Sequence, residues 1–196
     1  QMSNIIFESA RGYDVIRLED VFLRERKIFL CRNVDSANVN ELIKQIMYLD
    51  SVSENDEITL YINSPGGSVQ DGLVLYDALR LVKAPIKTVA TGLAASMGAV
   101  LFLAGDKREM LPHSKLMIHD PSFGSLNLGG KKSAEVRQLL DDLNNCRELI
   151  ASIIAKRSGK SMDEVFEVTK NDTYYTAQEA LKSGLATAII ENRKEA

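Results

Sequence analysis

The chain has 196 residues, of which 45% are hydrophobic and 26% charged, the usual balance of a soluble globular domain with a full core. A formal net charge of −3 gives no electrostatic reason to bind nucleic acid or an anionic membrane surface. No apolar run reaches the ~18–20 residues that span a bilayer, and residues 2–9 lack the basic start and apolar length of a signal peptide. We therefore expect a single domain over residues 1–196 and a cytoplasmic location.

The cysteine content argues against a metal centre. Cys31 and Cys146 are the two cysteines, and they lie far apart with no cluster of Cys and His around them. A zinc site needs several such ligands at short spacing, so we expect none. Isolated thiols fit a reducing cytoplasm, where they pack as small hydrophobic groups. No pattern calls for a cofactor in this chain.

Strand-like runs alternate with helical patterns in the first half of the chain. Residues 27–31 and 57–62 are predicted strands, and apolar spacing predicts a helix over 37–50 between them. A helix over 68–82 and a strand over 86–90 follow. This alternation favours βαβ units and a largely parallel sheet.

The centre of the chain continues the pattern. After the strand over 86–90, a turn of small residues carries Ser96 and leads into an apolar helix that ends near Leu103. Residues 110–111 and 115–118 are predicted to be extended.

A long amphipathic helix is predicted next. An apolar stripe runs through residues 132–157 for about seven turns, or ~40 Å at 1.5 Å per residue. We expect part of this helix to project and to need a partner, with a long core helix as the alternative. Ser161 and Thr176 each begin a capping box, which predicts a short helix after each. Gly184 should end the second of these, before a last strand over 185–190.

Ser96 is the first candidate for chemistry. A serine on a tight turn between a strand and a helix exposes its hydroxyl beside backbone N–H groups, as an acyl-transfer nucleophile requires. It also needs a base within hydrogen-bond reach. His119, one of only two histidines, follows a predicted strand and precedes Pro121, so it can reach the end of another strand. A purely structural role for His119 is the alternative, and His113 competes with it but lies in a predicted turn.

A third group would orient the imidazole and stabilise its charged form. Asp120 is adjacent to His119, but neighbours on an extended strand point to opposite faces. Asp172, just before the predicted helix that follows Thr176, is the better geometric candidate. An ordinary turn aspartate is the alternative reading of Asp172.

Two backbone N–H groups could stabilise an oxyanion. Gly66 and Gly67 follow the predicted strand over 57–62 and, lacking a Cβ, would let a substrate approach the backbone closely. The N–H of Met97, at the start of a helix, is the natural second donor. A Gly-Gly pair by itself is usually only a turn. Its place at the carboxyl end of a strand, where open α/β sheets bind ligands, favours a site.

Taken together, these motifs resemble the ClpP family, the proteolytic subunits of the Clp protease. The resemblance runs from about Arg11 to Ile190. Its most specific segments are Tyr-Ile-Asn-Ser-Pro-Gly-Gly at 61–67, Gly-Leu-Ala-Ala-Ser-Met-Gly at 92–98, Met-Ile-His-Asp-Pro at 117–121 and Tyr-Tyr-Thr-Ala-Gln-Glu-Ala at 174–180. It implies an α/β, crotonase-like fold of ββα-type units, with a mainly parallel sheet and a projecting handle helix.

The resemblance also implies an activity, that of a serine endopeptidase cleaving unfolded polypeptides to short peptides through an acyl-enzyme. Ser96 would be the nucleophile, His119 the general base and Asp172 the acid that orients it. The N–H groups of Gly67 and Met97 would form the oxyanion hole. The residues expected to bind substrate are Gly66, Ser68, Val69, Pro121 and Gly124.

A barrel assembly is implied as well. Heptameric rings would stack in pairs to a tetradecamer that encloses the sites. Residues from about 1 to 18 would form an axial segment. Residues from about 123 to 157 would form the handle region, which includes a strand near 123–130 that aligns the substrate. An ATP-driven AAA+ ring unfoldase would feed the chamber, so ATP would be used by that partner and no cofactor by this chain.

Several residues depart from the usual family pattern. Asp120 stands where glutamine is usual, and Lys170-Asn171 replaces an Asp-Arg pair that crosses between rings. Glu109 stands where an aromatic residue helps form the docking socket for the unfoldase. The departures concern assembly and partner surfaces, so a weakly active or regulatory subunit of a mixed ClpP barrel is the second hypothesis. An acyl-CoA enzyme on the same fold is the third.

Overall fold

The computed structural model describes residues 4–9, 12–124 and 127–190. Parts of the predicted axial segment and handle region, and residues 191–196, lie outside these ranges. No helix within the described ranges is both long and apolar enough to cross a membrane.

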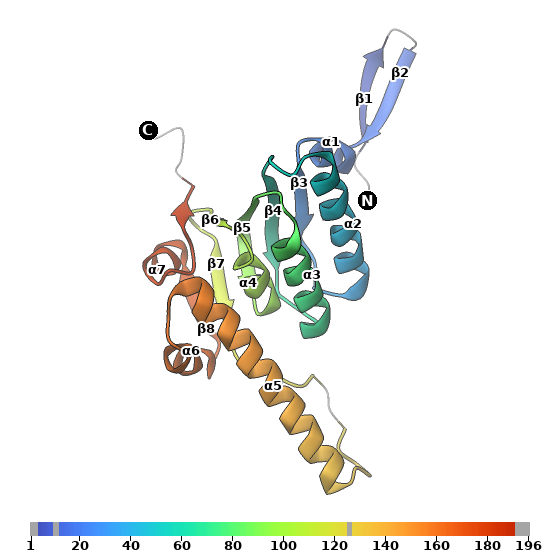
Figure 1. The fold of residues 1–196 in the computed structure, drawn as a ribbon. Helices are drawn as coiled ribbons and strands as arrows, with labels where there is room; N and C mark the ends of the chain where they lie inside the picture. Colours follow the sequence, from blue (N-terminus) through green and yellow to red (C-terminus); the bar gives the residue numbers. More distant parts are fainter. Residues whose placement is uncertain (1–3, 10–11, 125–126, 191–196) are drawn as a thin grey trace.

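An N-terminal hairpin stands away from the rest of the molecule (Figure 1). Its strands, β1 (Asn4–Ser9) and β2 (Gly12–Arg17), pair antiparallel, and α1 (Leu18–Arg24) connects them to the main sheet. No sequence pattern predicts these elements, because no buried face imposes a period on the hairpin. Ile6 and Val15, for example, are 66% and 62% exposed.

The main sheet has seven strands, and its pairing order is β3–β4–β5–β6–β9, with β7 pairing to both β5 and β8. All these pairings are parallel except that of β7 with β8, which confirms the predicted α/β class with a mainly parallel sheet. The strands are β3 (Lys27–Leu30), β4 (Ile58–Ser64), β5 (Ile86–Ala95), β6 (Lys107–Met110), β7 (Lys115–Ile118), β8 (Thr173–Thr176) and β9 (Ala188–Ile189).

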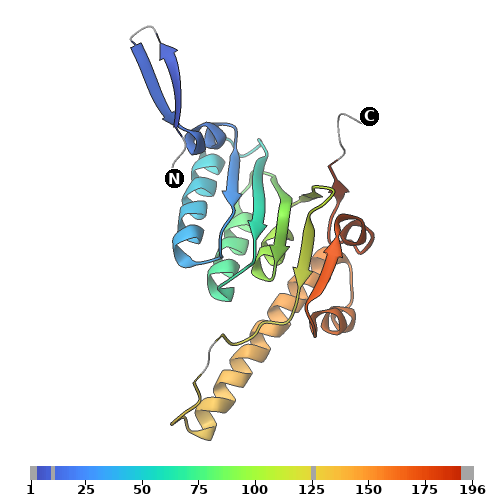
Figure 2. The ribbon, with the colours of Figure 1, turned by 180° about the vertical axis from the view of Figure 1, so that it is seen from behind.

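Helices cover one face of strands β3 to β5, where α2, α3 and α4 lie side by side (Figures 1 and 2). Both layers contribute fully buried side chains, such as Leu60 on β4, Leu75 on α3 and Phe102 on α4. Each such burial contributes about 1.5–3 kcal/mol to stability. The helices after α1 are α2 (Ser36–Val52), α3 (Val69–Leu81), α4 (Met97–Phe102), α5 (Ser133–Ser158), α6 (Met162–Thr169) and α7 (Ala177–Lys182).

Three predicted strand boundaries are wrong. The extended run expected over 110–111 is β6 (Lys107–Met110), which ends where that run was expected to begin. β5 does not end at residue 90 but continues to Ala95, because the backbone of residues 93–95 pairs with β7. The expected strand over 185–190 shrinks to β9 (Ala188–Ile189), since the Leu185 carbonyl oxygen accepts a bond from the Arg108 side chain. The turn of small residues expected before Ser96 is therefore strand almost to its end.

Helix α5 projects from the molecule, as predicted (Figure 1). Its buried residues are Ile150, Ala151 and Ile154, which all lie toward its C-terminal end. The capping boxes predicted at Ser161 and Thr176 are both present and begin α6 and α7.

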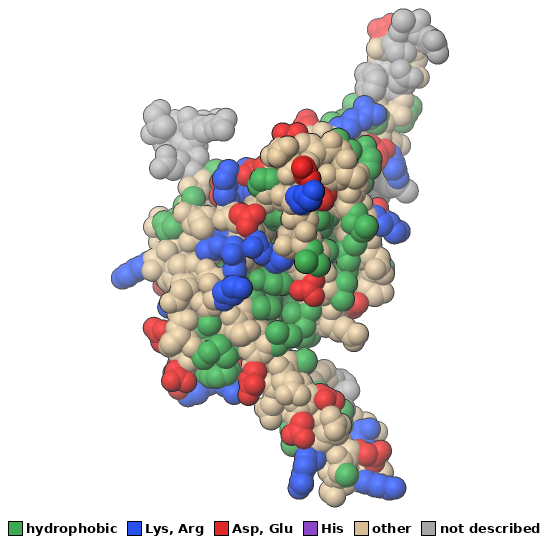
Figure 3. Space-filling view, viewed as in Figure 1, with side chains coloured by type: hydrophobic (Ala, Val, Ile, Leu, Met, Phe, Trp, Pro, Cys, Tyr) green, Lys and Arg blue, Asp and Glu red, His purple; other side chains and the backbone are tan. Residues whose placement is uncertain are grey.

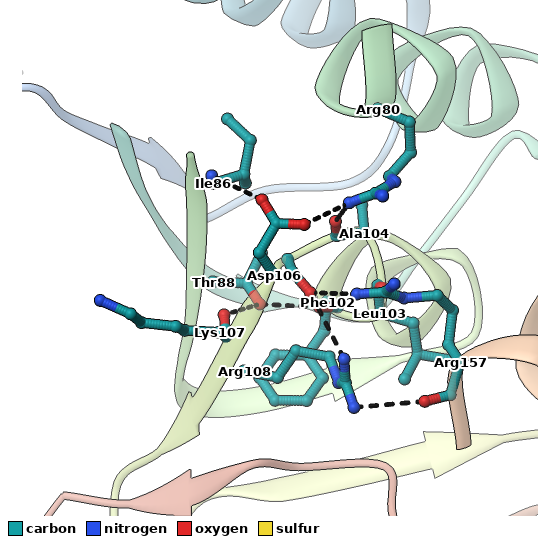
Figure 4. A network of polar contacts seen from close by, with 11 residues as sticks. Arg80, Ile86, Thr88, Phe102, Leu103, Ala104, Asp106, Lys107, Arg108 and Arg157 are labelled. Atoms are coloured by element: carbon teal, nitrogen blue, oxygen red, sulfur yellow. Dashed lines mark hydrogen bonds and ion pairs between the residues drawn. The ribbon is translucent and has the colours of Figure 1, made fainter. Parts of the chain in front are cut away.

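Arginines hold the C-terminal end of α4 (Figure 4). Arg157 of α5 donates from Nε to the Leu103 carbonyl oxygen at 2.8 Å. Arg108 of β6, 8% exposed, donates from Nε to the Leu185 carbonyl oxygen at 2.8 Å, and burial together with the nearby Arg157 lowers its pKa. The first bond ties the end of α4, the helix that begins beside Ser96, to α5, and the second ties β6 to the C-terminal segment.

Candidate active site

Ser96 is the one residue between β5, which ends at Ala95, and α4, which begins at Met97. Its φ of 54° is positive, a conformation that only Arg26 shares among the non-glycine residues of the described ranges. Such a backbone costs a non-glycine residue about 1–3 kcal/mol, so the surrounding fold must hold it. Part of that support is the Ser96 N–H, which donates to the Met117 carbonyl oxygen of β7 at 2.9 Å.

The loop after β4 packs against this turn so closely that only glycine fits. Gly66 has a φ of +94°, and a Cβ there would lie 2.7 Å from both the Ala95 carbonyl oxygen and the Ser96 Cβ. A Cβ on Gly98 would lie 2.9 Å from the Ser64 carbonyl oxygen. At Gly66 the close approach is therefore made by the serine turn, and the expected approach of a substrate there stays a prediction.

Three polar side chains meet beside this turn. Ser96 Oγ lies 2.8 Å from His119 Nε2, and His119 Nδ1 lies 3.1 Å from Asp172 Oδ1. Both separations are hydrogen-bond distances. The structure therefore brings together the three residues that the sequence predicts as a set. The competing histidine, His113, lies exposed in the turn between β6 and β7.

Strand pairing explains why His119 and Asp172 meet. β7 and β8 are antiparallel, with Ile118 opposite Thr173. His119 directly follows the first of these residues and Asp172 directly precedes the second, so the two side chains start from neighbouring points. β8 is the element that positions the carboxylate, and no sequence pattern predicts it.

The two ends of this hydrogen-bonded series differ in exposure. The His119 side chain is 26% exposed, whereas the Asp172 side chain is 60% exposed. Water competes for a carboxylate that is so accessible, which weakens its bond to the imidazole. The carboxylate end is therefore open to solvent in the single chain.

The two predicted oxyanion donors lie in the same neighbourhood. A Cβ on Gly66 would lie 3.0 Å from the Met97 nitrogen, which places the glycine loop directly against that amide. Gly67 is fixed on its other side by Val34, since the two form an isolated parallel bridge and Ser68 N–H donates to the Val34 carbonyl oxygen at 2.8 Å.

An apolar pocket opens beside Ser96 and His119. Of the predicted substrate-binding residues, Val69 and Pro121 line it. Ser68 caps α3, because its Oγ accepts from the Asp71 N–H at 3.2 Å, and substrate binding at Ser68 stays a prediction. Among the described residues other than its chain neighbours, no atom lies within 4 Å of a Cβ placed on Gly124, and substrate binding there also stays a prediction. The other apolar residues that line the pocket are Met97, Val100, Ile118, Ile150 and Ile154.

Periodicity alone could not assign these lining residues to a pocket. Ile150 and Ile154 belong to the apolar stripe of the predicted long helix, which identifies them as buried without saying what they face.

A second, larger hollow of about 440 Å³ lies among α1, β3 and α2, and its lining includes Cys31. Burial raises the pKa of the Cys31 thiol, so the reactive thiolate is scarce at neutral pH. Among the described residues, no group of three or more His, Cys, Asp or Glu side chains is placed to hold a metal ion.

A family model described as Clp protease matches residues 9–193 of the 196-residue chain. The chain belongs to the Clp protease family. Membership supports a peptidase of the ClpP type and accounts for the α/β fold with its mainly parallel sheet. The matched range includes every predicted site residue of this Clp protease family member.

Two of the departures from the family pattern make contacts within the chain. Lys170 pairs with Glu167 at 2.6 Å on the exposed end of α6. Asp120 accepts from Arg147 Nε of α5 at 2.6 Å. No sequence signal could have found the second pair, because its members lie 27 positions apart on a loop and a helix.

Proposed function

We propose that this Clp protease family member is a serine endopeptidase that hydrolyses unfolded polypeptides to short peptides through an acyl-enzyme. The observation that carries the proposal is the hydrogen-bonded series from Ser96 through His119 to Asp172, at 2.8 and 3.1 Å. Nucleophile, base and orienting acid in that order can activate a hydroxyl for attack on a peptide carbonyl.

In the acylation step, Ser96 Oγ attacks the carbonyl carbon and its proton passes to His119 Nε2. Asp172 accepts the Nδ1–H hydrogen bond and stabilises the imidazolium that forms. The N–H groups of Gly67 and Met97 donate to the oxyanion. The C–N bond then breaks as His119 returns the proton to the leaving amine.

In the deacylation step water is the nucleophile, and His119 and the two N–H groups keep their roles. His119 Nε2 takes a proton from the water that attacks the Ser96 ester, and the same two N–H groups hold the second oxyanion. Collapse releases the carboxylic acid and returns the proton to Ser96 Oγ. Both steps use side chains and backbone of this chain alone, so we propose that it needs no cofactor.

The apolar pocket favours a substrate with an apolar side chain next to the cleaved bond. Val69, Val100 and Ile150 line it, and none of the Asp, Glu, Lys or Arg side chains in the described part of the chain does. A charged substrate group placed there would lose its hydration without a partner. Gly66, Ser68 and Gly124 remain candidate contacts for the rest of the peptide.

Family membership implies a ring assembly and an unfoldase partner in general, and we propose paired heptamers as the specific form. Figure 3 shows hydrophobic side chains gathered over α2 and α3, where Met47 and Leu81 are 63% and 82% exposed. On the projecting α5, Leu140 and Leu149 are 51% and 48% exposed. Apolar surfaces of this kind mark interaction sites.

The direct test incubates the purified chain with a fluorophosphonate probe and maps the adduct by mass spectrometry, with Ser96→Ala as control. We expect one adduct, on Ser96, and hydrolysis of an unstructured peptide without ATP and in the presence of a metal chelator. No adduct in any assembly would contradict the proposal. Labelling that requires a second ClpP protein would favour the weakly active or regulatory subunit of a mixed barrel.

A further inference from the structure

The residue that follows His119 is held from two sides. The Asp120 N–H donates to the Thr169 carbonyl oxygen at 2.7 Å, and the Asp120 carboxylate accepts from Arg147 Nε at 2.6 Å. The second bond joins two charged groups and is therefore stronger than a neutral hydrogen bond. Both side chains are partly buried, with 33% of Arg147 and 27% of Asp120 exposed, so water competes less than it does at Asp172.

Arg147 is itself fixed in place. Its guanidinium carbon lies 4.2 Å from the centroid of the Phe166 ring of α6, a cation–π contact. Ile150 and Ala151 lie three and four positions further along α5 and are 6% and 2% exposed. Residues at those spacings share a helix face, so Arg147 begins the part of α5 that is packed against the core.

The other anchor, Thr169, also belongs to a packed element. It is 1% exposed and ends α6, whose Val165 is fully buried. Asp172 follows three residues later, so the end of α6 holds both the residue after His119 and the acid that bonds to His119 Nδ1.

Few other contacts can position His119 from its C-terminal side. β7 ends at Ile118, and the described residues between His119 and the start of α5 form neither helix nor strand. Among the described residues that follow His119 and precede α5, Asp120 is the one that hydrogen-bonds to packed helices.

We infer that Asp120 and Arg147 are positioning residues that keep the His119 imidazole within hydrogen-bond reach of Ser96. The inference rests on the proposed function, because it assigns the pair a role in proton transfer by His119. A misplacement of about 1 Å in a catalytic group can lower a rate by ~100-fold, so a single pair can matter for the rate.

The test measures kcat per labelled Ser96, with the labelled fraction counted by a fluorophosphonate probe, for Arg147→Met, Arg147→Lys, Asp120→Asn and the double variant Asp120→Asn/Arg147→Met. We expect Arg147→Met to lower this kcat about 10-fold or more with KM within about 2-fold, since the base is displaced and the substrate pocket is not. Arg147→Lys should recover part of the loss, because it retains the charge without the planar guanidinium. The double variant should be no worse than Arg147→Met, as expected for two residues that act through one contact.

Glu148→Gln is the matched control, since it removes one charge from the exposed neighbour of Arg147 on the same helix and should leave kcat unchanged. A lower melting temperature with unchanged kcat per labelled site would show that the pair only stabilises the fold and would overturn the inference. A rise in KM at constant kcat would also overturn the inference, as would a loss of kcat in the double variant equal to the product of the two single losses.

If Arg147→Met does not fold, Arg147→Lys and Asp120→Asn decide the question by the same criterion. Wild-type chain that neither labels nor hydrolyses peptide would instead overturn the proposed function, and the inference with it.

Discussion

The two sides of the candidate active site are built in different ways. On the nucleophile side, Ser96 precedes α4, a helix in which every residue from Met97 to Phe102 is buried. On the base side, the side chains of His119 and Asp172 are 26% and 60% exposed and lie beside short strands near the edge of the sheet. Core packing therefore holds the nucleophile, whereas a few polar contacts hold the base and its acid.

Because the two sides are held differently, substitutions on them should differ in how they affect stability and activity. A change in the packing around Ser96 should act on stability and activity together, because the same contacts maintain both. A change at Asp172 should act mainly on activity, because so exposed a side chain contributes little to the free energy of unfolding.

Ser96→Ala should have the largest effect on catalysis. Without the hydroxyl no acyl-enzyme forms, so kcat/KM for a peptide substrate should fall by ~10⁴-fold or more. The packing around the turn is kept, and the melting temperature should stay within about 2 °C of the wild type. Peptide hydrolysis and thermal unfolding check the two expectations. Residual activity within about 10-fold of wild type would show that Ser96 is not the nucleophile.

Gly66→Ala should disrupt the nucleophile side as a whole. The new Cβ would meet the Ala95 carbonyl oxygen at 2.7 Å, at a φ of +94°, so we expect the free energy of unfolding to fall by about 2–4 kcal/mol and labelling of Ser96 to be lost. Gly130→Ala is the matched control, because Gly130 has a φ of +79° but, apart from its chain neighbours, no atom of the described ranges lies within 4 Å of an added Cβ. It should lose only about 1 kcal/mol in a denaturant titration. Equal effects of the two substitutions would contradict the close packing of the serine turn.

Asp172→Asn should act on activity alone. An amide leaves His119 without its charged partner, and kcat should fall by roughly 100-fold, less than in a buried triad because Asp172 is 60% exposed. The melting temperature should not change measurably. Asp141→Asn, at an exposed carboxylate on α5, is the control and should leave both quantities unchanged. A large loss of stability in Asp172→Asn would remove the distinction between the two sides.

Asp106→Asn should have a small, pH-dependent effect on stability, remote from the site. Burial alone would raise the pKa of Asp106, but the Ile86 N–H and the Arg80 guanidinium outweigh it and hold the pKa below its ordinary value. A lowered folded-state pKa stabilises the protein above the ordinary carboxyl pKa, and this contribution disappears as the pH falls through the folded pKa. The variant should therefore be less stable at pH 7, by at most about 0.5–1 kcal/mol because the Asp106 side chain is 49% exposed and water screens its charge, and the difference should shrink below a pH of about 4.

Glu54→Gln is the control for this pH series, because Glu54 and its partner Lys83 have side chains that are 52% and 74% exposed. It should change stability by less than about 0.5 kcal/mol. A difference between wild type and Asp106→Asn that stays constant down to low pH would contradict the assigned pKa shift.

The contrast between the two sides also marks what the sequence can predict. Buried elements leave a periodic pattern, so the strands and helices predicted from residue 27 to Ser96 are confirmed within two residues of the predicted ends, except that β5 runs on to Ala95. The serine turn is recognisable because tight packing permits only small residues there.

The base side leaves a weaker pattern. β8 has four residues that alternate between half-buried and exposed, too short a run to stand out from a loop. The pairing of Asp120 with Arg147 depends on how α5 docks, which no local pattern encodes. His119 could be named from the scarcity of histidine and Asp172 from its setting, both with the family resemblance, but what fixes them in place could not be predicted.

The proposed active site depends most directly on whether His119 activates Ser96. The second-order rate constant for labelling of Ser96 by a fluorophosphonate, compared between wild type and His119→Ala, measures this in one experiment. We predict ready labelling of the wild type and a rate at least about 100-fold lower in the variant. Equal rates in the two proteins, or an adduct on another residue, would contradict the proposed active site.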